Sequence, residues 1–258
     1  MSLILTEQVG GVLKITLNRP DKFNSFNREM ALQLQEALDK SAGDKSIRAI
    51  YLTGEGKAFC AGQDLAEALD PNGPGITKIV EEHYNPIIKK IRSIEKPFVC
   101  AVNGVAAGAG ANIALACDVV VAAASASFIQ AFSKIGLIPD SGGTFYLPRL
   151  VGFGKASALM MLGDKVSATD AERMGMIYKV SDDAQLTEEA LQLARTLSDM
   201  PTRGIGLTKK LLNQAMDNTL EQQLTAEGKE QTTAASTYDY KEGVGAFLEK
   251  RKPVFKGE

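Results

Sequence analysis

Residues 96–147 constrain the fold more than any other part of this sequence. The segment opens with Phe98–Val102, an apolar run that predicts a buried strand, and continues through a Gly/Ala-rich turn into a helix that ends near Ala116. A strand followed by a glycine-rich helix start is a position at which free N–H groups and the helix dipole bind anions. The turn is no dinucleotide fingerprint, because Ile113 stands at the third glycine position. Small residues for tight helix packing are an equally good interpretation.

Short strands and helices alternate over the first two thirds of the chain, which predicts an α/β fold. The expected strands span residues 3–5, 12–17, 47–53, 98–102 and 118–123. Asn27 is expected to cap a helix closed by Gly43, and a second helix covers residues 76–94, where Pro86 should kink or restart it. Beyond about Ala168 the chain is mostly helical, with Thr187 as the expected cap of one helix.

This organisation suggests two regions, an α/β core over residues 1–198 and a helical region over residues 199–258. We expect the second region to pack on the core or on a neighbouring subunit. The 258 residues fit one large domain or a domain with an appendage.

Composition excludes several classes of function. A net charge of −2 gives no electrostatic footprint for nucleic acid, and no apolar run reaches the roughly 18 residues of a membrane span. The first residues lack the basic and apolar regions of a signal peptide, and the three cysteines have no CxxC spacing. We therefore expect a cytoplasmic protein with reduced thiols. The single histidine, His83, excludes a His-rich metal site, and its apolar helical stripe indicates a core-edge or surface residue.

Asp140 is the candidate general base. Its apolar neighbours at 137–139 would desolvate the carboxyl group and raise its pKa, which suits proton transfer. The alternative is structural: Asp140 or Ser141 caps a helix that starts near Thr144. The Asp-Ser-Gly-Gly sequence also resembles a serine-protease nucleophile loop, but His83 on an apolar stripe makes a poor triad base.

A second loop offers a backbone amide. The small residues around Gln63, in Cys-Ala-Gly-Gln-Asp, would let a ligand approach its N–H group. Two such donors from separate loops, aimed at one developing oxyanion, would lower a barrier by roughly 3–4 kcal/mol each. The pairing of this loop with the Gly/Ala turn is a hypothesis at this point.

Several motifs resemble those of the crotonase (enoyl-CoA hydratase/isomerase) superfamily. The matching pieces are residues 18–20, 24–26, 57–65, 96–118, 136–144 and 243–251, which together cover essentially the whole chain. The resemblance implies a spiral of ββα units that forms two stacked sheets, with C-terminal helices that build homotrimers or dimers of trimers. It also implies an acyl-CoA thioester substrate, with no cofactor beyond the coenzyme A of the substrate and no metal.

The resemblance also assigns roles to residues. The oxyanion hole would consist of the N–H groups of Gln63 and Ala109, and the coenzyme A moiety would run along residues 22–25 and 61–66. The residues expected to contact substrate are Lys22, Phe23, Ser25, Ala61, Gly62, Asp64, Leu65, Ala66, Gly110, Asn112 and Phe132.

Hydratases of this family carry two glutamates, and this chain has Asn112 and Phe132 in their places. Asp140 falls where isomerases of the family hold a catalytic aspartate. The resemblance is greatest to the branch that isomerises 1,2-epoxyphenylacetyl-CoA to oxepin-CoA. We therefore expect an isomerase in which Asp140 moves a proton, on that substrate or from 3-enoyl-CoA to 2-enoyl-CoA. Asn112 would hydrogen-bond substrate or water, or serve only in packing.

Three alternatives stay open. Two belong to the same family, an enoyl-CoA hydratase and a dienoyl-CoA isomerase. The third is a non-catalytic acyl-CoA-binding subunit that stabilises a partner enzyme.

Overall fold

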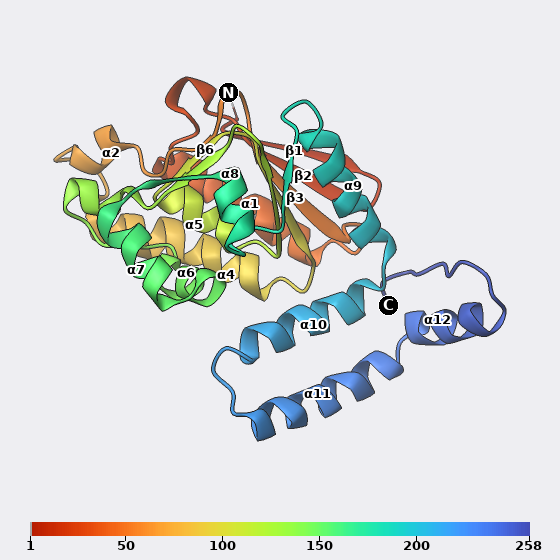
Figure 1. Ribbon diagram of the computed structural model, residues 1–258. Coiled ribbons are helices and arrows are strands. Elements are labelled where there is room, and N and C mark those ends of the chain that lie inside the picture. The colour runs from red at the N-terminus through yellow and green to blue at the C-terminus, as the bar shows by residue number, and fades with distance from the viewer. Residues whose placement is uncertain (1) are drawn as a thin grey trace.

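The computed structural model describes residues 2–258, which form an α/β body and a run of C-terminal helices (Figure 1). The larger sheet of the body has the order β1-β2-β3-β5-β7-β10 and the smaller sheet has the order β4-β6-β8-β9. The larger sheet comprises β1 (Ile4–Val9), β2 (Val12–Leu17), β3 (Ala49–Gly54), β5 (Phe98–Val102), β7 (Val119–Ala123) and β10 (Lys179–Ser181). The smaller sheet comprises β4 (Ala58–Cys60), β6 (Val105–Ala107), β8 (Ser127–Ile129) and β9 (Lys165–Ser167).

The two sheets arise from a repeated ββα unit, as the family resemblance implied. A strand of the larger sheet is followed by one of the smaller sheet and then by helix, in β3-β4-α2, β5-β6-α5 and β7-β8-η3. The chain turns sharply between the strands of a unit. At Gly104, between β5 and β6, a Cβ atom would lie 2.2 Å from the carbonyl oxygen of Lys57, so only glycine fits. All pairings from β2 to β10 in the larger sheet are parallel, and β1 forms an antiparallel hairpin with β2.

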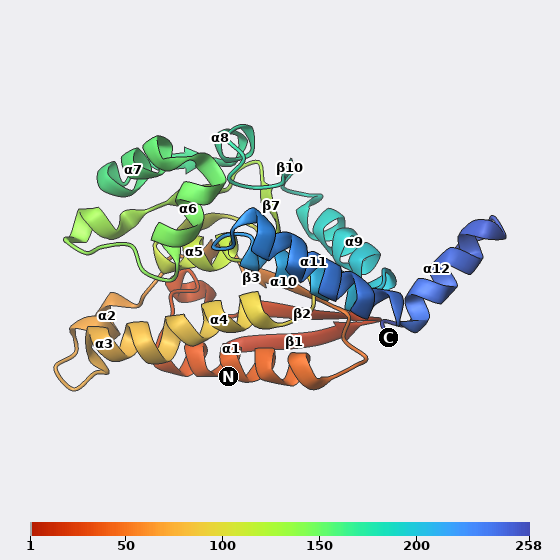
Figure 2. The ribbon, with the colours of Figure 1, turned by 90° about the horizontal axis from the view of Figure 1, so that it is seen from below.

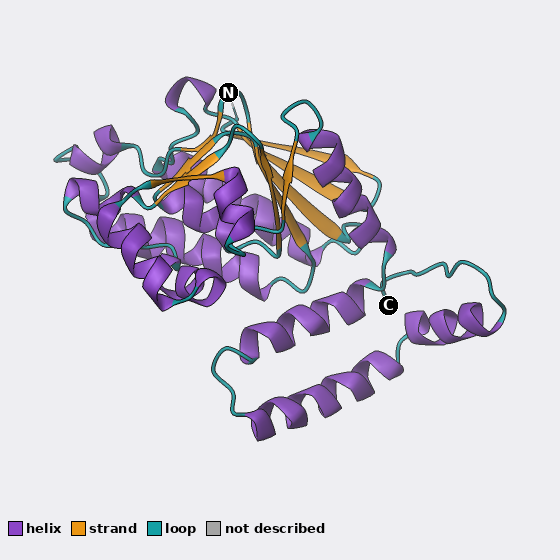
Figure 3. Ribbon diagram, in the orientation of Figure 1, coloured by secondary structure: helices purple, strands orange, loops and turns teal. Residues whose placement is uncertain are grey.

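Helices cover the sheets (Figure 3). Those of the body are η1 (Pro20–Lys22), α1 (Arg28–Gly43), α2 (Leu65–Leu69), α3 (Gly75–Lys78), η2 (Ile79–Tyr84), α4 (Asn85–Ser93), α5 (Ala109–Leu115), η3 (Ala131–Ile135), α6 (Gly143–Val151), α7 (Phe153–Leu162), α8 (Ala168–Arg173) and α9 (Leu186–Asp199). Helix α9 packs across β2, β3, β5 and β7, and α1 lies alongside α4 (Figure 2).

The predicted cap of α1 is confirmed, since the Asn27 side chain accepts a hydrogen bond from the Met30 amide at 3.0 Å. The predicted cap of α9 was wrong: Gln185 occupies that position and Thr187 is already helical.

Pro86 restarts the helix, as predicted, and does so through a π-helical turn, η2. Proline has no N–H group, so it cannot donate to the preceding turn and carbonyl oxygens are left without helical partners. The Gln35 side chain of α1 supplies a donor, with its amide nitrogen 2.7 Å from the carbonyl oxygen of Glu82 and 3.2 Å from that of His83. Single π-helical turns of this kind occur frequently at functional sites.

The C-terminal helices are α10 (Thr202–Gln214), α11 (Leu220–Ala235) and α12 (Tyr238–Leu248). Helix α10 packs on α4 and α9, while α11 and α12 extend away from the sheets (Figure 1). The buried ammonium group of Lys209 fixes α10 to the body, donating to the carbonyl oxygen of Ile91 at 2.6 Å and pairing with Asp118 at 2.8 Å. The division into regions at residues 198 and 199 stays a prediction.

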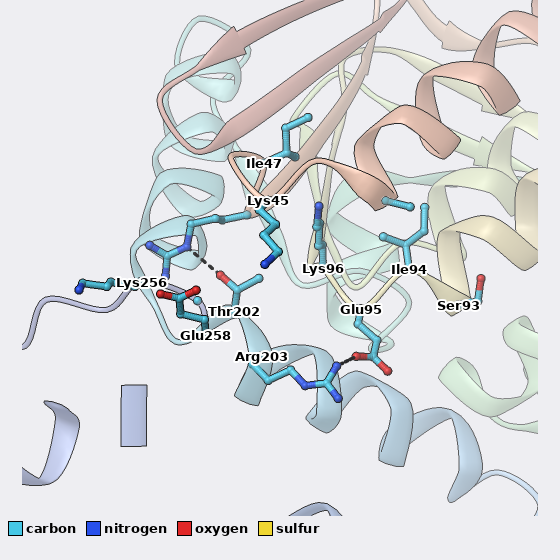
Figure 4. Close-up of a pocket in the computed structure, with 13 residues that line it drawn as sticks. Lys45, Ile47, Ser93, Ile94, Glu95, Lys96, Thr202, Arg203, Lys256 and Glu258 are labelled. Atoms are coloured by element: carbon cyan, nitrogen blue, oxygen red, sulfur yellow. Dashed lines mark hydrogen bonds and ion pairs between the residues drawn. The ribbon is translucent and has the colours of Figure 1, made fainter. Parts of the chain in front are cut away.

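A cavity of about 450 Å³ lies where α10 and the last residues of the chain meet the body (Figure 4). Charged side chains dominate its lining, including Lys45, Lys96 and Glu95, and Arg203 of α10 pairs with Glu95 across it. Arg48 joins the two parts by donating to the Thr202 hydroxyl at 2.8 Å. Across residues 2–258, none of the helices combines the length and apolar character needed to cross a lipid bilayer.

Candidate active site

Two backbone amides without protein acceptors face one cavity. Gln63 follows β4 and Ala109 follows β6, and these two strands are parallel neighbours. The carboxyl ends of parallel strands meet at one edge of a sheet, so the two donors come together there. Within residues 2–258, neither amide donates a hydrogen bond to another protein group. The two residues predicted to supply donors from separate loops therefore line one cavity, and their action as a pair stays a prediction.

A glycine with positive φ precedes each donor. Gly62 has φ 93° and Gly108 has φ 54°, values that glycine adopts without strain. A Cβ atom on Gly62 would lie 3.0 Å from the carbonyl oxygen of Ala107 and 3.6 Å from the amide nitrogen of Ala109. The two loops are thus in backbone contact, which leaves no space for a side chain between the donors.

The cavity beside these amides has a volume of about 220 Å³ and a mostly apolar lining. Its lining residues are Ala61, Gly62, Gln63, Leu65, Ala68, Ile76, Ile79, Tyr84, Gly108, Ala109, Ala131, Phe132, Lys134, Ile135, Leu137 and Asp140. All three predicted catalytic residues, Gln63, Ala109 and Asp140, are in this set. An apolar cleft with a few convergent polar groups is the usual form of a small-molecule site.

Asp140 lies on the turn between η3 and α6, and its carboxyl group is half-buried. Burial raises its pKa, and the Ser141 hydroxyl, which donates to Oδ1 at 2.8 Å, partly offsets this. The capping alternative was wrong for both residues, because Gly142 occupies the cap position of α6 and no side chain caps it. The Asp140 carboxyl group therefore has no role in capping α6.

Asn112 does not line the cavity, so of its two expected roles the structure matches packing and not contact with substrate. It is 1% exposed, and its side-chain nitrogen donates to the backbone carbonyl of Asp140 at 2.8 Å. The Gln130 side chain donates in turn to Asn112 at 2.8 Å. A Cβ atom on Gly143 would lie 2.4 Å from the Asn112 side-chain nitrogen, so Gly143 makes room for this bond. Asn112 therefore supports the turn that carries Asp140.

Phe132, the second residue that the family resemblance aligned with a hydratase glutamate, lines the cavity as expected. Its ring lies 3.7 Å from the position of a Cβ atom on Gly108, against the loop that carries one of the two donors. The cavity lining at Phe132 is therefore apolar, and this side chain cannot exchange protons.

The remaining predicted substrate contacts divide into two groups. Ala61, Gly62 and Leu65 line the cavity, whereas Lys22, Phe23, Ser25, Asp64, Ala66 and Gly110 do not. The loop at 22–25 nevertheless runs beside the loop at 61–66, since the Ala61 amide donates to the carbonyl oxygen of Phe23 at 2.9 Å. A coenzyme A path along both loops stays a prediction.

Asp64 and Gly110 have structural contacts, and their contacts with a ligand stay predictions. The Asp64 carboxylate pairs with Arg19 at 2.8 Å and caps α2. Burial is the largest single influence and raises the pKa of Asp64, but the hydrogen bond and charge of Arg19 together with the backbone amides of Ala66 and Glu67 lower it below its usual value. Gly110 packs on Cys60, where a Cβ atom would lie 2.4 Å from the carbonyl oxygen.

Tyr84 is the polar lining residue that the sequence did not reveal. It is fully buried, and its hydroxyl donates to the side-chain oxygen of Gln63 at 2.8 Å. The available signal was its position on an apolar helical stripe two residues before Pro86. The neighbouring His83 is also fully buried, so its expected place at the core edge or surface was wrong; its Nε2 lies 3.2 Å from the Arg28 guanidinium.

The chain is similar in sequence and in fold to known enzymes. Residues 7–258 match the family model described as enoyl-CoA hydratase/isomerase. The chain is 50% identical to the 1,2-epoxyphenylacetyl-CoA isomerase of Escherichia coli and 35% identical to the 2,3-dehydroadipyl-CoA hydratase of that organism, each over 100% of both chains. An enoyl-CoA hydratase structure from Bacillus anthracis superposes with a TM-score of 0.93 at 33% identity, over 99% of this chain and 100% of that one. The chain therefore belongs to the enoyl-CoA hydratase/isomerase family, whose enzymes act on acyl-CoA thioesters.

Proposed function

We propose that this enzyme is an acyl-CoA isomerase in which Asp140 is the proton-transfer group. The observation that carries the proposal is that Asp140 is the one carboxylate among the described residues that line the cavity, which also receives the free amides of Gln63 and Ala109. A single carboxylate is chemically sufficient for a 1,3-proton shift, because it can act first as base and then as acid.

The two amides would polarise the thioester. The carbonyl oxygen accepts hydrogen bonds from the Gln63 and Ala109 N–H groups, and these bonds strengthen as enolate charge develops on that oxygen. Fixed donors in a water-poor site contribute roughly 3–4 kcal/mol each to such a transition state. The Ala109 donor also belongs to the first turn of α5, where the helix dipole favours negative charge.

Asp140 would take a proton from one carbon of the acyl group and return it to another. The raised pKa of its carboxyl group brings its basicity closer to that of a useful general base. On a ring epoxide, the same carboxylate would steer the epoxide-to-oxepin rearrangement.

Hydration is a poorer match to this site. Addition of water needs an acid and a base placed around the attacking water molecule. Asn112 is buried away from the cavity and Phe132 is apolar, so neither replaces the hydratase glutamates. The named hydratase among the relatives above is less similar to this chain than the named isomerase.

For the substrate, we propose 1,2-epoxyphenylacetyl-CoA, with conversion to oxepin-CoA, together with or in place of a 3-enoyl-CoA. The apolar cavity of about 220 Å³ suits a ring or a short acyl chain, and the 50% identical isomerase carries the name of the first reaction. We propose no cofactor beyond the coenzyme A of the substrate, and a homotrimer or a dimer of trimers as the assembly.

The test is Asp140→Asn, assayed with 1,2-epoxyphenylacetyl-CoA, 3-hexenoyl-CoA and crotonyl-CoA by product mass and ultraviolet absorbance. We expect kcat for isomerisation to fall by about 10²- to 10⁴-fold, since that is the usual contribution of a general base. Binding of the CoA ester should persist, and Asp217→Asn, outside the cavity lining, should behave as wild type. Unchanged isomerisation in Asp140→Asn would refute the assignment, and fast hydration of crotonyl-CoA would favour a hydratase.

A further inference from the structure

The side chain of Gln63 is held at both ends, although only its backbone amide is needed in the proposed oxyanion hole. Its oxygen accepts from the Tyr84 hydroxyl at 2.8 Å, and its nitrogen donates to the Glu67 carboxylate at 2.9 Å. The same nitrogen lies 3.3 Å from the carbonyl oxygen of Asp64. A glutamine side chain has three rotatable bonds, so these contacts remove most of its freedom.

Both anchors are themselves fixed. The Glu67 carboxylate accepts from the backbone amide of Arg28 at 2.9 and 3.1 Å, where α1 begins and helical N–H groups lack internal partners. Tyr84 is fully buried at the end of the π-helical turn η2, with its ring edge-on to Phe26 at a centroid distance of 5.9 Å. Phe26 in turn donates its amide to the carbonyl oxygen of Gly62 at 2.7 Å, directly before Gln63 in the chain.

From this arrangement we infer that Tyr84 is a positioning residue for the oxyanion hole, acting through the side chain of Gln63 to orient the Gln63 amide toward the thioester oxygen. Burial raises the pKa of the Tyr84 phenol well above its ordinary value, so the hydroxyl keeps its proton and remains a donor. The hole donors act only if they are aligned with the oxygen, and misalignment by a fraction of an ångström weakens them.

The first test is Tyr84→Phe, which removes one hydroxyl and keeps the ring that packs on Phe26. We expect kcat to fall by about 10- to 100-fold, less than complete loss of a hole donor, while KM changes by less than about threefold. Tyr51→Phe is the matched control, because Tyr51 is equally buried and its hydroxyl has no partner among the described residues. A rise in KM at unchanged kcat, or equal effects of both variants, would overturn the inference.

A second measurement reports directly on the hydrogen bonds that the oxyanion hole donates to the thioester carbonyl. Hexanoyl-CoA labelled with ¹³C at its carbonyl is unreactive, and the infrared band of its bound carbonyl should lie at lower frequency than in water. In Tyr84→Phe we expect the band to move at least halfway back, whereas Tyr51→Phe should keep the wild-type value. An unmoved band in Tyr84→Phe would refute the positioning role.

A double-mutant cycle separates the Gln63 contact from general packing. Gln63→Leu keeps the backbone amide but removes the acceptor of the Tyr84 hydroxyl. If Tyr84 acts through that side chain, Tyr84→Phe should have little further effect on kcat in the Gln63→Leu background. The same fold-loss in both backgrounds would show that Tyr84 acts by another route.

This inference rests on the proposed oxyanion hole but is independent of the role of Asp140. Asp140→Asn should lose turnover and keep the wild-type carbonyl band, whereas Tyr84→Phe should shift the band. A failure of the isomerase proposal would therefore leave the infrared result intact, and a failure of the Tyr84 inference would leave the proton-transfer result intact.

Discussion

The ionisation of Asp140 is set by two opposing influences at the scale of single atoms. Burial disfavours the carboxylate and raises the pKa, while the Ser141 hydroxyl stabilises the carboxylate and lowers it. Ser141 holds its hydroxyl in place from a left-handed backbone conformation, with φ 52°. Strained residues of this kind concentrate at functional sites.

The first prediction concerns pH. Proton removal requires the Asp140 carboxylate, so kcat/KM should rise with pH through an acidic limb whose midpoint lies above 3.8, the ordinary value for an aspartate. Ser141→Ala removes the bond that favours the carboxylate, so the limb should move to higher pH. The measurement is the pH profile of kcat/KM for both proteins; a shift toward lower pH in Ser141→Ala would contradict the argument.

The raised pKa of Asp140 also affects the stability of the folded protein. A carboxyl group whose pKa is raised by folding binds its proton more tightly in the native state, so it costs stability as pH rises through the native pKa. Asp140→Asn removes that cost, and the variant should unfold at neutral pH no more easily than wild type. A loss of activity in Asp140→Asn would then reflect lost chemistry and not a lost fold.

The sequence revealed a site residue where the motif that marks it lies within the few residues around it. Gln63 and Ala109 follow glycines in short, side-chain-poor turns, and Asp140 lies among apolar neighbours; each feature is visible in a few letters. Tyr84 and Asn112 could not be placed in this way. Their roles depend on contacts with residues 21 and 28 positions away, which sequence spacing does not encode.

At the scale of elements, the site depends on the close approach of α5 to β4. Gly110 is the second residue of α5 and touches Cys60 of β4 through its backbone. The same first turn carries the Ala109 donor, and the residues after β4 carry the Gln63 donor. The distance between the two elements therefore determines the distance between the two amides.

The second prediction is that Gly110→Ala will separate the donors. A Cβ atom at this position would lie 2.4 Å from the Cys60 carbonyl oxygen and 2.7 Å from its Sγ atom, so α5 must move away. Overpacking of this kind typically costs about 1–3 kcal/mol of stability, and kcat should fall as well. Thermal unfolding and kcat are the measurements.

Gly154→Ala on α7 is the control for that experiment, because a Cβ atom there would meet nothing within 4 Å. Alanine is a better helix former than glycine by about 1 kcal/mol, so the control should be as stable as wild type or more stable. If Gly110→Ala behaves like Gly154→Ala, the contact between α5 and β4 does not set the geometry of the hole.

Elements were predictable where the apolar pattern is plain in the letters; β1, with polar or charged residues at 6–8, was predicted as residues 3–5 and spans Ile4–Val9. Apolar and polar letters alternate over residues 13–17, although the folded strand Val12–Leu17 is buried everywhere except at the half-buried Lys14, and α1 carries its own capping residue. Strands β4, β6, β8, β9 and β10 were missed because each has three residues, too few to show a period. Such strands exist because neighbouring strands pair with them, as β6 does between β4 and β8.

At the scale of the whole molecule, α11 and α12 lack a core of their own. Large apolar side chains remain exposed along them, including Leu220 at 74%, Phe247 at 82% and Leu248 at 74%. The two helices lie away from the sheets, joined to the body through α10 and through the last residues of the chain, where Arg48 donates to the Phe255 carbonyl oxygen at 2.9 Å (Figure 1). Extended exposed apolar surface is typical of a protein–protein interface.

The last prediction follows from this surface. Phe247 is the most exposed of the three named side chains, so Phe247→Glu would place a charge in the surface that the proposed assembly would bury, and burial of an unpaired charge is costly. We expect wild type to sediment as a trimer or a dimer of trimers and Phe247→Glu to sediment as a smaller species.

Leu32→Glu, on the exposed face of α1, is the control and should keep the wild-type mass. Because α10 is fixed to the body through Lys209, the variant should stay folded. A wild-type protein that is monomeric at all concentrations, or a Phe247→Glu variant of unchanged mass, would contradict assembly through these helices.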